Sequence, residues 1–264
     1  MSMQARKPLR YLLATMCNPY QPSSCLTEMV MYKVDIPISK DLKLTLGNIC
    51  KLAQEVGFDA CGVAPVRRLD DDAQFMDNWI AQGLHGEREY LARNCDKRYD
   101  PTALVPGAQA VVVCLLSFEH SGRDYHRKVK SMLYALEAKL KETFGEDIVS
   151  ATHQHIFCDS APMLERRWCV EAGLGWIGKN HQLIHPTLGS LVHPGEIVLN
   201  VSINEYRVSD IGKGCGACRL CLEACPTGAL RNEVWDAREC IAYTTHHCLE
   251  CQIPCPLNQY IVNN

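Results

Sequence analysis

At 264 residues, 47% of them hydrophobic, the chain is long enough to bury a substantial core as one large domain or as a large and a small one. Its formal net charge of -3 argues against a surface built to coat a polyanion. No apolar run approaches the roughly 18 to 20 residues that span a bilayer, so we expect a soluble, cytoplasmic protein that does not bind membranes.

The first predicted elements lie between residues 40 and 83. Apolar residues recur at helical spacing over 46–56, and Gly57 stands where a left-handed residue would end that helix. A strand running into a proline-marked loop is expected over 58–66, and a short helix over 73–82. Residues 1–39 precede this pattern, so we expect them to form an N-terminal extension.

The middle of the chain carries the clearest patterns. Residues 110–118 form a continuous valine-rich run of strand length, which is typical of a strand covered on both faces. Residues 126–143 place apolar side chains along one face of a long amphipathic helix. Two further strands are expected over 155–158 and 196–203. Helices that alternate with buried strands predict the fold class α/β (α+β).

This pattern stops near residue 205, so we assign the cofactor and substrate domain to residues 40–208. The segment 209–214 is the expected linker. Residues 209–264 hold eight of the 16 cysteines and are expected to form a separate ferredoxin-like domain.

The cysteines of this last segment fall into two runs. The first has the spacing CxxCxxCxxxCP, and the second ends in CxxCxxxCP. In bacterial ferredoxins this spacing holds [4Fe-4S] clusters, and the fourth cysteine of one run ligates the cluster of the other. We therefore assign one [4Fe-4S] cluster to Cys215, Cys218, Cys221 and Cys255, and a second to Cys225, Cys240, Cys248 and Cys251. Zinc is the alternative, because it also takes CxxC pairs.

A polar, glycine-rich stretch over residues 158–190 is the best candidate for the chemistry. Asp159 follows a predicted strand and, with Ser160, starts a predicted helix whose first turn would hold Pro162. Arg166 would then lie two helical turns on and on the same face, which pairs an acid with a cation. The alternatives are a helix cap for Asp159 and a solvated helix surface for Arg166.

The motifs "DSAPMLER", "AGLGWIGKN", "GRDYH" and "GLHGEREYL", together with the two cysteine runs, resemble those of the epoxyqueuosine reductase family. These are iron-sulfur and cobalamin enzymes that complete queuosine in tRNA, and they are relatives of reductive dehalogenases. The resemblance covers roughly residues 41–258. It implies a nitroreductase-like cobalamin-binding domain followed by a ferredoxin-like domain with two [4Fe-4S] clusters.

The resemblance also implies roles for single residues. Asp159 would be the catalytic proton donor, with Arg166, Asp124 and His126 in the substrate pocket. Because such a donor must hold its proton near neutral pH, we expect burial to raise the pKa of Asp159. The residues expected to contact cobalamin are Trp176, Gly178, Lys179, Asn180 and Ser190.

Two departures from the family pattern bear on the substrate. Cys240 and Cys248 lack the longer insertion that family members carry between them, and no helical-repeat domain follows Cys255. Both changes remove surface that would face tRNA, so a related small substrate is an alternative to tRNA. The implied electron donor is an external protein of the flavodoxin or ferredoxin type. A second reading is an electron-transfer or sensor protein, with a bound flavin or none, that catalyses nothing itself.

Overall fold

The computed structural model describes residues 43–122, 124–206, 214–231, 234–245 and 248–258. All of them belong to one compact unit of the chain, residues 43–264. The expected N-terminal extension and most of the expected linker lie outside the described residues. Within the described part, no helix has the length and apolar character needed to cross a membrane.

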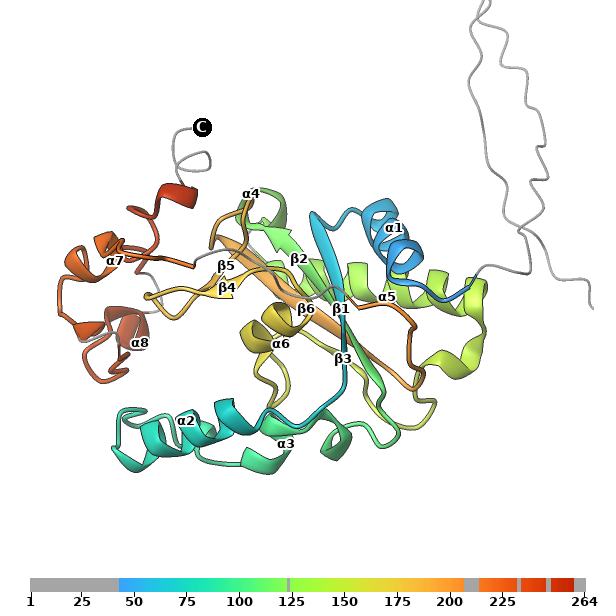
Figure 1. Cartoon of the computed structure of the whole chain (residues 1–264), viewed down its shortest axis with the longest axis horizontal. Coiled ribbons are helices and arrows are strands. Elements are labelled where there is room, and N and C mark those ends of the chain that lie inside the picture. Colours follow the sequence, from blue (N-terminus) through green and yellow to red (C-terminus); the bar gives the residue numbers. More distant parts are fainter. Residues whose placement is uncertain (1–42, 123, 207–213, 232–233, 246–247, 259–264) are drawn as a thin grey trace, which may run out of the picture. The chain divides into compact units, whose positions relative to one another are not determined.

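The first half of this unit holds the helices α1 to α4 and the strands β1 and β2 (Figure 1). The N-cap Thr45 begins the first helix, and Gly57, with φ of 107°, ends it as the sequence predicts. The elements in chain order are α1 (Leu46–Val56), β1 (Ala60–Pro65), α2 (Asp70–Ala81), α3 (Cys95–Tyr99), β2 (Ala110–Ser117) and α4 (Phe118–Ser121).

The second half supplies the remaining strands of the layer and the cysteine-rich segment. Its elements are α5 (Tyr125–Phe144), β3 (Ile156–Phe157), α6 (Glu165–Glu171), β4 (Trp176–Ile177), β5 (Leu183–Ile184), β6 (Val192–Leu199), α7 (Leu220–Glu223) and α8 (Ile241–Thr245). Short 3-10 turns lie at Glu89–Leu91, Pro101–Ala103, Glu146–Ile148 and Pro256–Asn258.

Four strands form one sheet in the order β1-β2-β6-β3, and every neighbouring pair is antiparallel. Strand β2 lies inside the sheet and is buried along its whole length, as its valine-rich sequence predicts. A smaller sheet pairs β4 with β5. The mixture of helices and sheet confirms the predicted fold class, although its strands run antiparallel rather than as parallel βαβ units.

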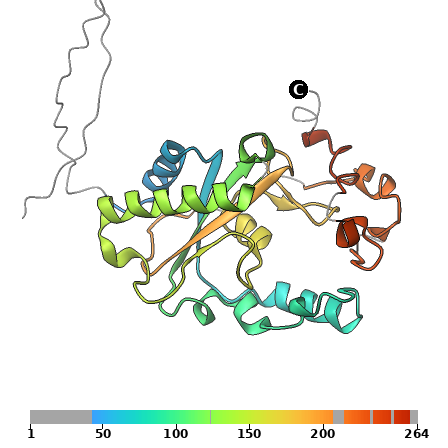
Figure 2. The same cartoon turned by 180° about the vertical axis from the view of Figure 1, so that it is seen from behind.

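Helices cover both faces of the main sheet (Figures 1 and 2). On one face α1 and α5 pack against alternate residues of β2, including Val112 and Cys114, in one core cluster. On the other face α6 packs against Val113 and Phe157 in a second cluster. Antiparallel register places Glu196 of β6 directly opposite both Val113 and Phe157, so its side chain lies on the α6 face.

Candidate functional site

Asp159 lies just beyond the end of β3 in an unusual backbone conformation. Its φ is 49°, in the left-handed region that few non-glycine residues adopt. The Asp159 N–H donates to Oε1 of Glu165 at 2.6 Å, and the hydroxyl of Tyr125 donates to Oδ2 of Asp159 at 2.6 Å. Two side chains from different helices therefore fix the backbone and the carboxylate of Asp159.

The helix after β3 begins later than the sequence predicts. Helix α6 starts at Glu165, and its N-cap position is Leu164, so neither Asp159 nor Ser160 caps it. The prediction that Pro162 lies in the first helical turn is wrong for the same reason. Instead, residues 159–164 form a loop whose backbone is held by the carboxyl of Glu165 rather than by helical hydrogen bonds.

The pKa values of three neighbouring acids move in different directions. Burial alone would raise the pKa of Asp159, but hydrogen bonds with Glu165 and Tyr125 outweigh it and lower that pKa. Burial, the charge of Glu196 and the hydrogen bond with Asp159 raise the pKa of Glu165 to about 11. Burial also raises the pKa of Glu196 well above its usual value. The expected raised pKa of Asp159 is therefore wrong in this structure, and the raised pKa belongs to Glu165.

Aromatic rings form the wall beside Asp159. The rings of Tyr125 and His193 stack with centroids 3.6 Å apart, and His193 stacks on Phe118 at 4.3 Å. Burial lowers the pKa of His193 to about 4, so this imidazole is neutral at physiological pH. Burial and the hydrogen bond to Asp159 raise the pKa of Tyr125, which keeps its hydroxyl proton available for donation.

The other residues predicted for the substrate pocket are only partly brought together. Arg166 and His126 each contribute a charge that lowers the pKa of Asp159. Residues 159–164 are not helical, so the prediction that Asp159 and Arg166 share one helix face is wrong. Nη1 of Arg166 donates to the carbonyl of His181 at 3.0 Å. Asp124 caps α5 by accepting from the N–H of Arg127 at 3.1 Å.

Two adjoining cavities surround these residues. The larger, of about 870 Å³, is lined by Asp159, His126 and Arg166 among others. The smaller, of about 430 Å³, is lined by Arg166 and by four cysteines. Those cysteines are Cys225, Cys240, Cys248 and Cys251. The two cavities share lining residues, including Tyr125 and Arg166, so the acid and the cysteines open toward the same region.

The structure brings the eight cysteines together in two groups. Burial raises the pKa of Cys251 to about 12, and the neighbouring thiols that add to this rise belong to Cys248, Cys240, Cys221 and Cys225. Burial also raises the pKa of Cys255, whose neighbouring thiols belong to the other run, Cys215 and Cys218. Cys255 thus lies beside the first run although it ends the second. Among the described residues, no three His, Cys, Asp or Glu side chains converge on a position for a single metal ion.

Three of the residues predicted to contact cobalamin form hydrogen bonds with the cysteine segment. Nζ of Lys179 donates to the carbonyl of Gly216 at 3.0 Å, and Nδ2 of Asn180 donates to the carbonyl of Cys251 at 3.2 Å. The hydroxyl of Ser190 donates to Oε1 of Gln252 at 3.2 Å. In this structure these side chains dock the cysteine segment onto the α/β layer.

The other two predicted contacts lie in and beside the small β4–β5 sheet. Trp176 is in β4. A Cβ atom added to Gly214 of the cysteine segment would lie 3.8 Å from Cδ1 of the Trp176 ring. A Cβ at Gly178 would press on the side chains of Ile184 and Asn180. Close packing within the loop is therefore sufficient reason for glycine at position 178.

Known proteins with similar sequences decide the family. Epoxyqueuosine reductase from Cyclobacterium marinum is 36% identical over 213 residues, which cover 74% of this chain and 67% of that protein. The enzyme from Leadbetterella byssophila is 35% identical over 217 residues, which cover 76% of this chain and 69% of that protein. The chain belongs to the epoxyqueuosine reductase family. The resemblance inferred from the sequence is confirmed, and so is its assignment as an oxidoreductase.

Solved structures agree with this family. An epoxyqueuosine reductase crystallised with an epoxyqueuosine-modified tRNA stem loop matches with a TM-score of 0.70 and 26% identity, over 81% of this chain and 65% of that one. A B12-dependent reductive dehalogenase shares the fold, with a TM-score of 0.50, 16% identity and coverage of 79% of this chain and 31% of that one. The chain spans about two thirds of the length of its epoxyqueuosine reductase relatives. No family model matches the chain.

Sequence reasoning missed four residues around the acid of this epoxyqueuosine reductase family member. Glu165 is the second-last residue of the "DSAPMLER" motif, and its place six residues after Asp159 could have suggested a loop-closing contact. Tyr125 stands between the two predicted residues Asp124 and His126. His193 and Glu196 are polar residues in an otherwise apolar strand, and nothing else in the nearby sequence marks them as site residues. They reach the site only through the antiparallel pairing of β6 with its neighbouring strands. Glu165, Tyr125, His193 and Glu196 thus complete the surroundings of Asp159.

Proposed function

We propose that the chain reduces epoxyqueuosine in tRNA to queuosine, with two [4Fe-4S] clusters and cobalamin as cofactors. The observation that carries the proposal is the position of Asp159, an acid on the wall of a large cavity that adjoins a second cavity lined by four cysteines. An electron carrier has no need of a positioned acid, so this arrangement and the family both favour an enzyme over the electron-transfer or sensor reading.

The proposed clusters keep the ligand sets assigned from spacing. The neighbours of Cys255 and Cys251 support the crossing of the last cysteine of each run to the cluster of the other. Four ionised thiols so close together would repel one another, which is why burial and neighbouring thiols raise the pKa of Cys251. Iron supplies the positive charge that would offset this repulsion and remove the protons.

The size of the larger cavity supports the proposal of a large cofactor. Its volume of about 870 Å³ lies near the upper end of the range of roughly 300 to 1,000 Å³ typical of ligand pockets. When bound there, cobalamin would supply the reducing equivalents that break the epoxide C–O bond. Trp176, Gly178, Lys179, Asn180 and Ser190 stay the predicted contacts, with the last three acting from the side of the cysteine segment.

The residues of the chain would handle the proton of the reaction. Removal of an epoxide oxygen as water consumes two electrons and two protons, and the oxygen needs a proton as its bond to carbon breaks. Asp159 would deliver that proton, and the hydroxyl of Tyr125, 2.6 Å away, would stabilise the carboxylate left behind. Arg166 and His126 would favour the anionic oxygen of the substrate. Asp124 would act indirectly, by starting α5 just before Tyr125.

The proposed substrate is epoxyqueuosine within tRNA rather than the free base. Support comes from the relative that was crystallised with a modified tRNA stem loop, whose fold this chain shares over 81% of its length. The proposed electron donor is a flavodoxin or ferredoxin of the cytoplasm. We also propose the division of the chain into an N-terminal extension, a cofactor and substrate domain over 40–208 and a cluster domain over 209–264.

Anaerobic reconstitution tests this function. The full chain is loaded with iron, sulfide and cobalamin, separated by gel filtration, analysed for iron and cobalt, and incubated with a reductant and an epoxyqueuosine-modified tRNA stem loop. We expect about eight irons and one cobalt per chain, and queuosine in the product. Fully loaded protein that forms no queuosine would refute the substrate, and eight irons without retained cobalt would refute the cofactor.

A further inference from the structure

Glu196 is a buried acid in an apolar row. On the same face of β6, its neighbour Val198 and, four residues before Glu196, Val192 belong to the core cluster under α6. Glu196 itself is 0% exposed, and among the described residues neither of its carboxyl oxygens has a hydrogen-bond partner. Because an ionised carboxylate without a partner in such a place is strongly destabilising, Glu196 stays neutral.

Glu165 connects this buried acid to the cavity. It is the first residue of α6, and α6 packs on β6, which carries Glu196. Its carboxyl is hydrogen-bonded to the carboxyl of Asp159, and its Oε1 also accepts from the Asp159 N–H at 2.6 Å. Asp159 in turn is exposed to the cavity. The three acids thus form a cluster in which Asp159 and Glu165 line the larger cavity, while the buried Glu196 interacts with both through its charge.

Within the described residues, cations do not neutralise the buried part of this acid cluster. Among the described residues, positive charges act on this region from three side chains: Arg166 on Asp159 and Cys169, His126 on Asp159, and Lys130 on Cys158. None of them is among the main influences on the pKa of Glu165 or Glu196. The remaining titratable groups around the acids are neutral, because burial raises the pKa of the tyrosine hydroxyl and of the two thiols and lowers the pKa of the histidine. They are Tyr125 of α5, Cys158 after β3, Cys169 of α6 and His193 of β6.

We propose that Glu165 and Glu196 form a positioning and proton-holding pair for Asp159. This inference rests on the proposed function and deepens it. In each turnover Glu165 gives its carboxyl proton to the Asp159 carboxylate, and Asp159 gives a proton to the departing substrate oxygen. One O–H bond breaks and one forms at each transfer, and no electron moves. Glu196 stays neutral throughout and disfavours a lasting charge on Glu165, so the pair regains a proton from water at the exposed side of Asp159.

This arrangement explains how Asp159 can give up a proton although its own pKa is lowered. Two carboxyl groups that share a hydrogen bond titrate as a pair, in which the first proton is lost easily and the second is held strongly. At neutral pH the pair Asp159–Glu165 therefore carries one proton. That proton is available to the substrate through Asp159 even though Asp159 alone would be ionised.

Infrared spectroscopy of the full reconstituted chain, without substrate, tests the pair directly. Neutral carboxyl groups have a carbonyl stretch that is separate from that of carboxylates and that shifts in deuterated water. We expect such bands in the wild type at pH 8, and we expect Glu165→Gln and Glu196→Gln each to remove part of them. Glu137→Gln is the matched control, because Glu137 is ionised beside Lys141 and its loss should change no neutral band. Absence of neutral carboxyl bands in the wild type would overturn the proposal.

The pH dependence of turnover separates proton holding from a structural role. Glu165→Gln keeps an oxygen that accepts from the Asp159 N–H but has no proton to give. We expect its turnover to fall about tenfold or more, with the alkaline limb of the pH profile shifted by at least one pH unit toward acid. An unshifted alkaline limb would contradict the proposal even if turnover falls. Neutral carboxyl bands in a protein that reduces no epoxyqueuosine would refute the proposed function and leave the acid pair standing.

Discussion

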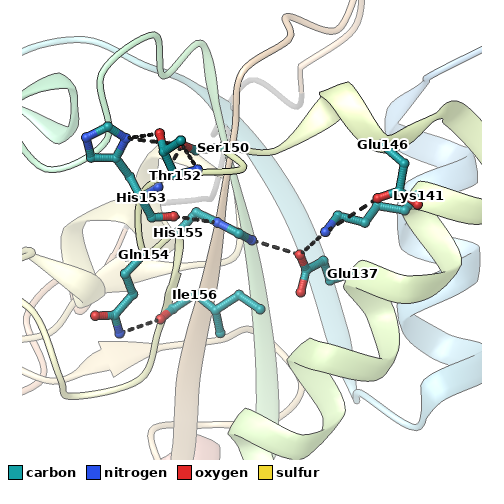
Figure 3. A network of polar contacts seen from close by, with 9 residues as sticks. All are labelled: Glu137, Lys141, Glu146, Ser150, Thr152, His153, Gln154, His155 and Ile156. Atoms are coloured by element: carbon teal, nitrogen blue, oxygen red, sulfur yellow. Dashed lines mark hydrogen bonds and ion pairs between the residues drawn. The ribbon is translucent and has the colours of Figure 1, made fainter.

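Buried acids lie on both faces of the main sheet, and the two faces treat them in opposite ways. On the α5 face Glu137 accepts from Lys141 at 2.7 Å and from His155 at 2.9 Å, as Figure 3 shows. On the α6 face the charge of Glu196 and the hydrogen bond with Asp159 act on Glu165, and no cation is among the main influences on its pKa. Paired charge stabilises a fold, whereas unpaired acids cost stability and are kept where a proton is used.

The pKa values record the same difference. Burial alone would raise the pKa of Glu137, but hydrogen bonds with Lys141 and His155 outweigh it and the pKa falls. Burial raises the pKa of Glu165, and the neighbouring acids raise it further. We therefore assign the ion pairs of Glu137 to stability and the acids around Asp159 to chemistry, and variants at the two places should differ in kind.

The largest effect should come from removing a cysteine ligand of one of the proposed clusters. Replacing Cys251 with Ala should reduce the iron content from about eight to about four per chain and abolish queuosine formation, because one cluster loses a ligand. Iron analysis and a turnover assay measure both. Cys218→Ala should do the same to the other cluster. Cys95→Ala in α3 is the control, and equal iron in Cys251→Ala and Cys95→Ala would contradict the ligand assignment.

Loss of the hydroxyl that supports Asp159 should have the next largest effect. Tyr125→Phe removes a hydrogen bond to a charged group, worth about 1.5 to 3 kcal/mol, so turnover should fall roughly 10- to 100-fold. The matched control is Tyr134→Phe, since Tyr134 lies on the same helix with its side chain exposed. Equal turnover in the two variants would remove Tyr125 from the mechanism.

Removal of the innermost acid should stabilise the protein in a pH-dependent way. The raised pKa of Glu196 means that the folded chain keeps a proton which the unfolded chain releases above about pH 4.3. Wild-type stability should therefore fall as pH rises, by up to about 1.4 kcal/mol per pH unit, and Glu196→Gln should escape this loss. Urea unfolding at pH 5 and pH 7 measures it, and a pH-independent difference between variant and wild type would count against a neutral Glu196.

The smallest effect, of opposite sign, is expected on the α5 face. The lowered pKa of Glu137 contributes stability that is present above the unfolded pKa and lost as pH falls through the folded pKa. Glu137→Gln should lower the free energy of unfolding by about 1 kcal/mol at pH 7 and by less at pH 3, without changing turnover. A marked loss of activity in Glu137→Gln would contradict the assignment of the Glu137 ion pairs to stability.

Local sequence signals predicted the elements that such signals determine. The valine-rich run gives β2, Gly57 ends α1, and the amphipathic pattern gives α5 with bounds one residue wider at each end. Asp159 was found because it follows a short strand. These features depend on residues within a few positions of one another.

The features that sequence could not give depend on tertiary contacts. Helix α6 starts at Glu165 because the Glu165 carboxyl binds the Asp159 N–H, a contact that overrides the helix-start signal of Pro162. Glu196 reaches the site only through strand register. Lys179 pairs with the carbonyl of Gly216 across 37 positions, which no local pattern encodes.

The most direct test of the account is single-turnover reduction of the epoxyqueuosine-modified stem loop by wild type, Asp159→Asn and Glu137→Gln, each matched for iron and cobalt. If Asp159 delivers the proton, Asp159→Asn should react about 100- to 10,000-fold more slowly while it retains both clusters and cobalamin. Glu137→Gln should react at the wild-type rate. Wild-type turnover by Asp159→Asn would contradict the account, since the acid at the end of β3 would then have no part in the reaction.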